Sequence, residues 1–431
     1  MTRPILIANA RLLDPATGLD ARGWLLVVDG RIADLGRGAA AAPDGAELVD
    51  ATDLCLAPGL VDMRVRLGEP GAEHKERIET GALAAAAGGV TTVAVLPDTD
   101  PPIDDPAMVE FVARRARQVR LVKVHPYAAV TKGCRGGELA EIGLLKAAGA
   151  VAFTDGERAV ASARVMRRAL SYASCFDALI VQHPEEATLA EGGAMNEGAI
   201  ASRLGLAGIP AAAEVVMIER DLRLLELTPG GRLHVAHVST GAAVEAIRAA
   251  KARGLRVTCD ASPHHLLLNE LEVEGYRTYA KVRPPLRGEE DRRALVEALR
   301  DGTIDAVASD HNPQDQDSKR LPFAQAEPGV IGVETMLPVL LTLHHEGTIG
   351  LQGLLRAVTC APADILGLEA GRLRPGAPAD LVLFDPEAPW KITEQGLRSL
   401  AKNTAFEGRL VQGRVVRTFV DGRTIFQRHD A

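Results

Sequence analysis

Residues 59–102 decide the fold: GLVDMRVRLGEPGAEHKERIETGALAAAAGGVTTVAVLPDTDPP. The stretch begins with an apolar run of strand length, breaks at a Gly-rich turn near residue 71, and continues into the helical periodicity of residues 74–89. Runs of strand length alternate with helical stretches in this way from about residue 58 to about residue 365. Such alternation predicts a parallel α/β sheet, and about eight units of this kind close into a (β/α)8 barrel of the TIM type.

The two ends of the chain have a different pattern of apolar and polar residues from the middle. Residues 5–14, 378–390 and 413–427 alternate apolar and polar side chains between turns rich in Gly and Asp, which is typical of antiparallel strands. The ends are therefore predicted to pair into one small composite β-sandwich. This predicts three segments: 1–57 as the N-terminal part of the sandwich, 58–365 as the barrel, and 366–431 as the C-terminal part.

Composition narrows the class of protein and of ligand. The 431 residues carry a net charge of −8 with basic residues scattered among acidic ones, which argues against a nucleic-acid surface. No apolar run approaches the roughly 18 residues of a membrane span, and the N-terminus turns polar too soon for a secretory signal, so a cytoplasmic location is predicted. The five cysteines show no CxxC spacing, which argues against a disulfide framework or a thiolate zinc site.

Four apolar runs each end in a side chain able to bind a metal: Asp155, His183, His237 and Asp310. One such residue is most often a helix cap or a turn former. Four of them at the carboxyl ends of barrel strands, where catalytic groups gather, indicate a zinc-like ion that activates water for hydrolysis. The polar segment 312–332 is predicted to be a surface loop of the kind that covers a site. His125 also ends a strand-like run, where a turn role is as good an interpretation as a ligand role.

Several motifs resemble those of one known family. Residues 59–102, together with VAFTD, VQHPEE, VAHVST, VRPPLR and ASDHNPQ, are similar to the long-chain (class I) dihydroorotases of the amidohydrolase superfamily. The resemblance spans nearly the whole chain and implies a barrel with a composite β-sandwich. It also implies zinc-dependent interconversion of dihydroorotate and N-carbamoyl-aspartate in pyrimidine biosynthesis. By resemblance Asp155 bridges metals, His183 and His237 are ligands, and Asp310 is both ligand and general base.

The first strand departs from the pattern of that family. Where the family has His-x-His-Leu-Arg, with two metal ligands and an arginine for the substrate carboxylate, this chain has Arg64, Arg66 and Gly68. A guanidinium is always protonated and has no acceptor, so it cannot bind a metal ion. Three further substrate-pocket positions are altered by the same comparison: Asp98, Arg283 and Gln314. Catalysis of the family reaction is therefore predicted to be weak or absent.

The two arginines suggest a physical replacement for the metal. Residues 64 and 66 project to the same side of a strand, so both side chains are expected to point inward and pair with Asp155 or Asp310. The alternative is that Arg64 and Arg66 only cap the strand end and contact backbone or water. A single zinc ion on Asp155, His183 and His237 is the most that this pocket is expected to hold.

Four functions compete at this point. The leading one, by resemblance to non-catalytic dihydroorotase-like proteins, is an inactive chain that supports the assembly of aspartate transcarbamoylase catalytic chains. The second is an active zinc dihydroorotase with a reduced metal site. The third is another cyclic amidase, related to allantoinase or dihydropyrimidinase. The fourth is a binding protein for an acidic metabolite, with Arg64, Arg66 and Arg283 as an anion cradle. A homo-oligomer, most simply a dimer, is expected in each case.

Overall fold

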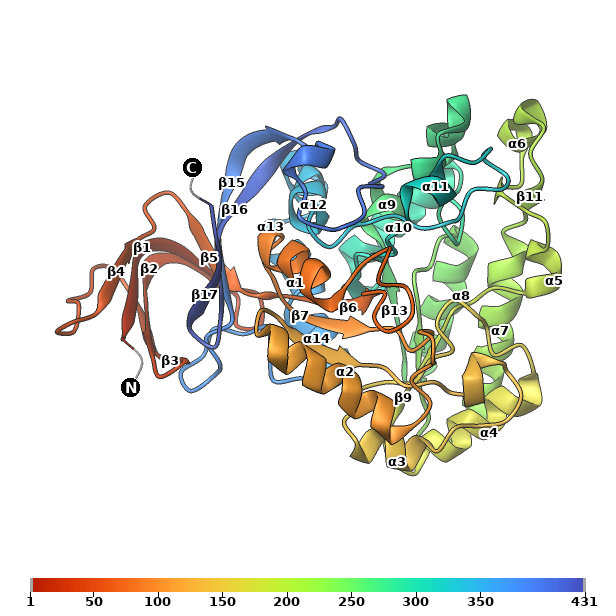
Figure 1. Ribbon diagram of the computed structural model, residues 1–431, viewed down its shortest axis with the longest axis horizontal. Coiled ribbons are helices and arrows are strands. Elements are labelled where there is room, and N and C mark those ends of the chain that lie inside the picture. Colours follow the sequence, from red (N-terminus) through yellow and green to blue (C-terminus); the bar gives the residue numbers. More distant parts are fainter. Residues whose placement is uncertain (1–2, 429–431) are drawn as a thin grey trace.

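The computed structural model describes residues 3–428 and has two parts, a barrel and a sheet that both ends of the chain build (Figure 1). The predicted α/β barrel with an added β-domain is confirmed. Both described ends of the chain lie at the sheet, on the side away from the barrel helices α4–α8. Within residues 3–428, no helix is both long and apolar enough to cross a membrane.

The barrel strands are parallel and short. Two sheets, of order β6-β7-β8 and β14-β13-β12-β9, are joined by bridges from Phe153 to Ala128 and Ile180, and Val65 bridges to His311 to close the ring. The strands are β6 (Leu60–Val65), β7 (Val90–Val95), β8 (Lys123–Pro126), β9 (Leu179–Gln182), β12 (Arg232–Val235), β13 (Val257–Ala261) and β14 (Ala306–Val307). Every residue of β6, β7 and β9 is buried, which explains why these strands read as continuous apolar runs rather than alternating ones.

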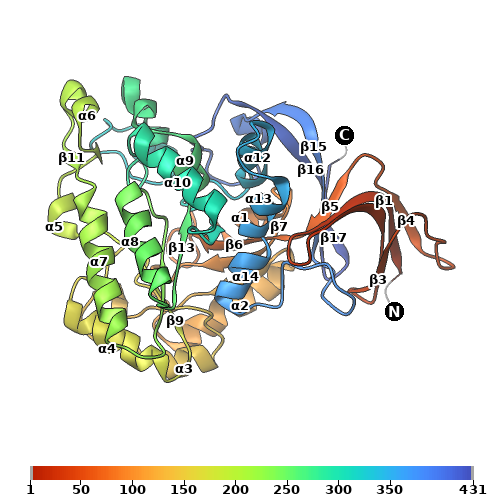
Figure 2. The same ribbon diagram turned by 180° about the vertical axis from the view of Figure 1, so that it is seen from behind.

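Helices cover the outside of the barrel, as the view from behind shows for α7, α8 and α10 (Figure 2). They are α1 (Ile78–Ala87), α2 (Pro106–Val119), α3 (Ile142–Ala147), α4 (Ala163–Ser174), α5 (Ala187–Ala190), α6 (Ala199–Leu204), α7 (Ala212–Glu226), α8 (Gly241–Ala252), α9 (Pro263–Leu267), α10 (Glu289–Asp301), α11 (Gln316–Lys319), α12 (Met336–His345), α13 (Leu351–Ala357) and α14 (Cys360–Leu366). Several begin at a capping side chain, such as Ser162 on α4 and Thr240 on α8, whose oxygens accept a backbone N–H of the first turn.

The second part is one eight-stranded sheet of order β17-β16-β15-β5-β1-β2-β3, with β4 beside β1. Its strands are β1 (Ile5–Asp14), β2 (Leu19–Val28), β3 (Arg31–Arg37), β4 (Glu47–Asp50), β5 (Cys55–Pro58), β15 (Leu381–Lys391), β16 (Leu410–Val420) and β17 (Arg423–Gln427). Strand β5 pairs with β1 on one edge and β15 on the other, so the predicted pairing of the two ends is confirmed. The exact domain boundaries stay a prediction.

Candidate functional site

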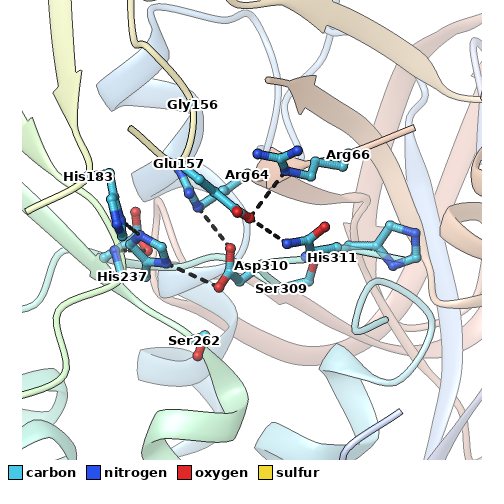
Figure 3. A network of polar contacts seen from close by, with 12 residues as sticks. Arg64, Arg66, Gly156, Glu157, His183, His237, Ser262, Ser309, Asp310 and His311 are labelled. Carbon is cyan, nitrogen blue, oxygen red and sulfur yellow. Dashed lines mark hydrogen bonds and ion pairs between the residues drawn. The ribbon is translucent and has the colours of Figure 1, made fainter. Parts of the chain in front are cut away.

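The candidate site lies at the carboxyl ends of the barrel strands and is centred on an ion pair between β6 and the segment after β14 (Figure 3). Arg64 is 2% exposed, and its Nε donates to Oδ1 of Asp310 at 2.8 Å. The expectation that Arg64 points inward to a carboxylate is thus confirmed. Its two terminal nitrogens are buried without a hydrogen-bond partner within residues 3–428, so the positive charge is only partly neutralised.

Two histidines extend this ion pair into a chain. His237 Nδ1 lies 3.1 Å from Oδ2 of Asp310, and His183 Nδ1 lies 2.8 Å from Nε2 of His237. Burial, reinforced by the nearby Arg64 charge, lowers the pKa of His237 to about 4, so this ring is neutral near pH 7. We assign its proton to Nδ1, where it donates to the carboxylate, and its Nε2 then accepts from His183. Three of the predicted site residues, His183, His237 and Asp310, therefore lie together, and they are hydrogen-bonded to one another.

Asp155 stands apart from this chain. It is buried, and its two carboxylate oxygens accept the backbone N–H of Thr131 at 2.9 Å and the Thr131 hydroxyl at 2.5 Å. Burial raises the pKa of Asp155 against the opposing effect of these hydrogen bonds. Neither Arg64 nor Arg66 makes an ion pair with it within the described chain, so the expectation of an inward arginine is met at Asp310 only.

Arg66 reaches different partners at the mouth of the barrel. It pairs closely with Asp98, and its Nε lies 3.3 Å from Oε1 of Glu157, which also accepts from the Asn312 amide. The expected contact with Asp155 or Asp310 is wrong for this residue. Arg66 comes two residues after Arg64, which moves it about 7 Å further along the strand direction, to the level of the loops. Glu157 was missed by the sequence reasoning, although it lies only two residues beyond Asp155.

Arg283 also has a carboxylate partner. Its Nε lies 2.8 Å from Oε1 of Glu185, and a terminal nitrogen of the guanidinium approaches the same oxygen to 2.6 Å. Burial opposes ionisation of Glu185, but His183 and Arg283 lower the pKa of this carboxyl to about 2. Each guanidinium of the expected anion cradle, Arg64, Arg66 and Arg283, is paired with a carboxylate of the chain, and the cradle stays a prediction.

A cavity of about 190 Å³ opens beside Arg66, and the remaining substrate-pocket positions that differ from the family pattern line it. Gly68, Asp98 and Gln314 all line it, and the Lys75 ammonium donates to Oε1 of Gln314 at 2.7 Å.

Gln314 belongs to the segment 312–332, which includes α11. Two buried lysines hold this segment by backbone carbonyls: Lys281 donates to Phe323 at 2.9 Å and Lys319 to Glu327 at 2.6 Å. Both anchors were missed from sequence.

The donor set does not fit zinc. Asp310 accepts from a guanidinium that occupies the face a cation would need, and His237 uses both ring nitrogens within the chain of hydrogen bonds. Nowhere in residues 3–428 do three His, Cys, Asp or Glu side chains converge with the spacing of a metal site. The ligand roles assigned by resemblance to Asp155, His183, His237 and Asp310 stay predictions, and the arrangement around them is that of a hydrogen-bonded ion pair.

Zinc binding is expected to be far below one ion per chain. A partly neutralised guanidinium beside Asp310 repels a dication, and both ring nitrogens of His237 are already hydrogen-bonded. Protein dialysed against zinc and then against buffer should contain little zinc by atomic emission. A reproducible content near one ion per chain, lost in His183→Ala, would contradict this expectation.

The family model and the named relatives that match this chain agree on one family. A family model described as Dihydro-orotase-like matches residues 54–243. A protein named dihydroorotase from Pelobacter propionicus is 46% identical over 98% of this chain and 100% of its own length. Another, from Anaplasma phagocytophilum, is 44% identical over 97% and 94%. The solved L-hydantoinase (dihydropyrimidinase) from Arthrobacter aurescens superposes with a TM-score of 0.89 at 28% identity over 99% and 96%. Dihydropyrimidinase from Brevibacillus agri shares the fold, with a TM-score of 0.86 at 22% identity over 98% and 95%.

Proposed function

This chain belongs to the dihydroorotase-like family, and we propose that it is a member whose pocket no longer performs metal-dependent hydrolysis while the fold is kept. The observation that carries the proposal is the Arg64 guanidinium, held at 2.8 Å on Asp310. This carboxylate would be the general base of a hydrolytic mechanism by resemblance, and here it is occupied by a permanent cation.

The electrostatics of Asp310 support the loss of that role. Burial alone would raise the pKa of this carboxyl, but the neighbouring His237 and the Arg64 charge hold the pKa well below its usual range. A general base is most effective when its pKa lies near the working pH, and a strongly acidic carboxyl accepts a proton poorly. Both oxygens of Asp310 are also engaged, one by Arg64 and one by His237, so a water or a substrate proton has to compete with these contacts.

We propose that the retained role is structural and belongs to pyrimidine biosynthesis: the chain supports the assembly of aspartate transcarbamoylase catalytic chains. The support is the resemblance to non-catalytic members of the family together with a well-packed barrel that has exchanged a metal pocket for ion pairs.

A second candidate is an active dihydroorotase with a reduced metal site. It is favoured by the names of the relatives, which match at 43–46% identity over nearly the whole chain. In this candidate Asp155, His183 and His237 would hold one zinc ion, which supplies a Lewis acid and an activated water when bound. It requires Arg64 to leave Asp310, because the present geometry leaves no shared face for a cation.

One assay separates the two candidates. We expect no cyclisation of N-carbamoyl-aspartate and no hydrolysis of dihydroorotate above the buffer rate, with or without added zinc. The Pelobacter propionicus dihydroorotase, prepared and assayed in parallel, serves as the positive control. Zinc-dependent turnover that disappears in His237→Ala would establish the second candidate instead. The structural role is tested by co-purification with aspartate transcarbamoylase from the same organism, and that enzyme's activity should fall when this chain is removed.

A further inference from the structure

A second cavity, which we call the α2–β8 groove, lies away from the Arg64 site and shares no residue with it. Its volume is about 480 Å³, within the usual size of small-molecule sites. Helix α2, strand β8 and the turn between β16 and β17 form its walls, so it joins the barrel to the sheet built by the chain ends. Its floor is apolar, with Val109, Ala116 and Val122 among the buried residues.

Four basic and two acidic side chains surround this apolar floor, the acidic ones being Glu110 and Asp421. Two of the basic side chains are neutralised: Arg117 pairs with Glu110 at 2.6 Å, and Lys123 pairs with Asp380 at 2.7 Å. The other two, Arg120 and Arg423, are exposed, and neither makes an ion pair within residues 3–428. The groove therefore presents two free guanidinium groups above an apolar surface.

His125 completes the lining of the groove. It is the strand-end histidine whose role the sequence left open, and the structure places it on β8 in the groove wall. Burial, with a smaller effect from the Lys123 charge, lowers the pKa of His125 to about 4, so the ring is neutral near pH 7. A neutral imidazole keeps one N–H, which can donate a hydrogen bond to a phosphate oxygen.

The position of helix α2 explains only some of the basic residues that line the groove. Basic residues favour the carboxyl end of a helix, which accounts for Arg117 and for Arg120 at the end of α2. It does not account for Arg423, which comes from the far end of the chain and lines the same groove. Arg120 also has a φ of 56°, a left-handed conformation where glycine is the usual residue. A charged side chain is thus retained where the backbone disfavours it.

We propose that the α2–β8 groove binds a small organic phosphate. The dianionic group lies between Arg120 and Arg423, and the organic part packs on the apolar floor. Two free guanidinium groups match the charge of a phosphate monoester, and guanidinium groups bind phosphate oxygens through paired hydrogen bonds. The inference is independent of the proposed function, because no residue of the pocket around Arg64 takes part.

Calorimetric titration of the full chain with phenyl phosphate tests the proposal. We expect one saturable site, with affinity about tenfold weaker in Arg120→Gly and in Arg423→Gln because each removes a charge-assisted contact. Arg120→Gly suits the left-handed backbone, so the fold is kept in that variant. Arg114→Gln is the matched control, because this exposed arginine lies on the same helix, makes no ion pair within residues 3–428, and does not line the groove.

Three outcomes would overturn the proposal. The first is the absence of saturable binding of phenyl phosphate. The second is unchanged affinity in both groove variants, or an equal loss in Arg114→Gln. The third is binding of inorganic phosphate or benzoate as tight as that of phenyl phosphate, because the apolar floor or the dianionic charge would then play no part.

Discussion

Replacing Arg64 with alanine is expected to destabilise the protein by about 3–5 kcal/mol, the usual cost of removing one partner from a buried ion pair. The pair qualifies as buried, since the side chains of Arg64 and Asp310 are 2% and 11% exposed. Without the guanidinium, the Asp310 carboxylate stays inside the barrel with two histidines nearby, His237 at 3.1 Å and His264 at 3.8 Å. Urea unfolding followed by circular dichroism measures the loss.

The pH dependence separates the charge from the lost packing. In the natural chain the folded-state pKa of Asp310 lies below its ordinary value, so the stability from this group is present above about pH 4 and is lost as the pH falls through the folded pKa. In Arg64→Ala burial raises the same pKa, so the carboxylate should destabilise increasingly as the pH rises to neutrality. The gap between the two proteins should therefore widen from about pH 4 to about pH 7.

Arg66→Ala is the matched control for Arg64→Ala. It removes an arginine from the same face of the same strand segment, but its ion pairs with Asp98 and Glu157 are about a quarter exposed, so a loss of about 1 kcal/mol or less is expected. Equal losses in the two variants, or a gap that does not change with pH, would show that the Arg64–Asp310 pair does not hold the centre of the site.

Replacing Gly68 with alanine is expected to cost about 2–4 kcal/mol, from the sum of a left-handed backbone and a steric overlap. Gly68 has a φ of +63°, and a Cβ at this position would lie 2.4 Å from the backbone oxygen of Glu76 and 2.7 Å from that of Ala72. Neither oxygen belongs to a flexible side chain, so the backbone itself must move. Thermal and urea unfolding report the loss.

Gly254→Ala isolates the backbone part of that cost. Gly254 follows helix α8 with a φ of +81°, and a Cβ at this position would meet no atom within 4 Å, so only about 1–2 kcal/mol is expected. If Gly68→Ala costs no more than Gly254→Ala, the overlap is absent and position 68 can carry a side chain. If it costs more, the arginine that the family places there cannot return by substitution alone, and restoring histidines at 64 and 66 will not revive a substrate pocket.

The sequence predicted the frame of the site because the physical rules involved are local. Buried parallel strands read as apolar runs, and the residues that follow them, such as His183, His237 and Asp310, meet at one end of the barrel. The period of two along a strand likewise places Arg64 and Arg66 on one side. The partners of these arginines were harder to predict, because each depends on how high along the barrel axis a side chain lies.

The residues that sequence reasoning missed come from loops. Glu157 and Glu185 follow strands, and Lys319 ends the short helix α11 within a long connection, so no periodicity fixes where these side chains point. Their contacts bring together distant segments, as Glu185 and Arg283 show, which are 98 positions apart in the sequence. Only the closed barrel places these segments side by side, so the three ion pairs of Arg64, Arg66 and Arg283 became visible in the structure alone.

The guanidinium on Asp310 differs from a bound ion in one respect that matters to a cell. It is made with the polypeptide and cannot dissociate, be chelated or be exchanged for a wrong metal. A barrel that depends on zinc to neutralise its inner carboxylates is exposed to every change in the zinc supply, whereas this one carries its own counter-charge in the gene. The counter-charge of Asp310 is therefore in place as soon as the barrel has folded.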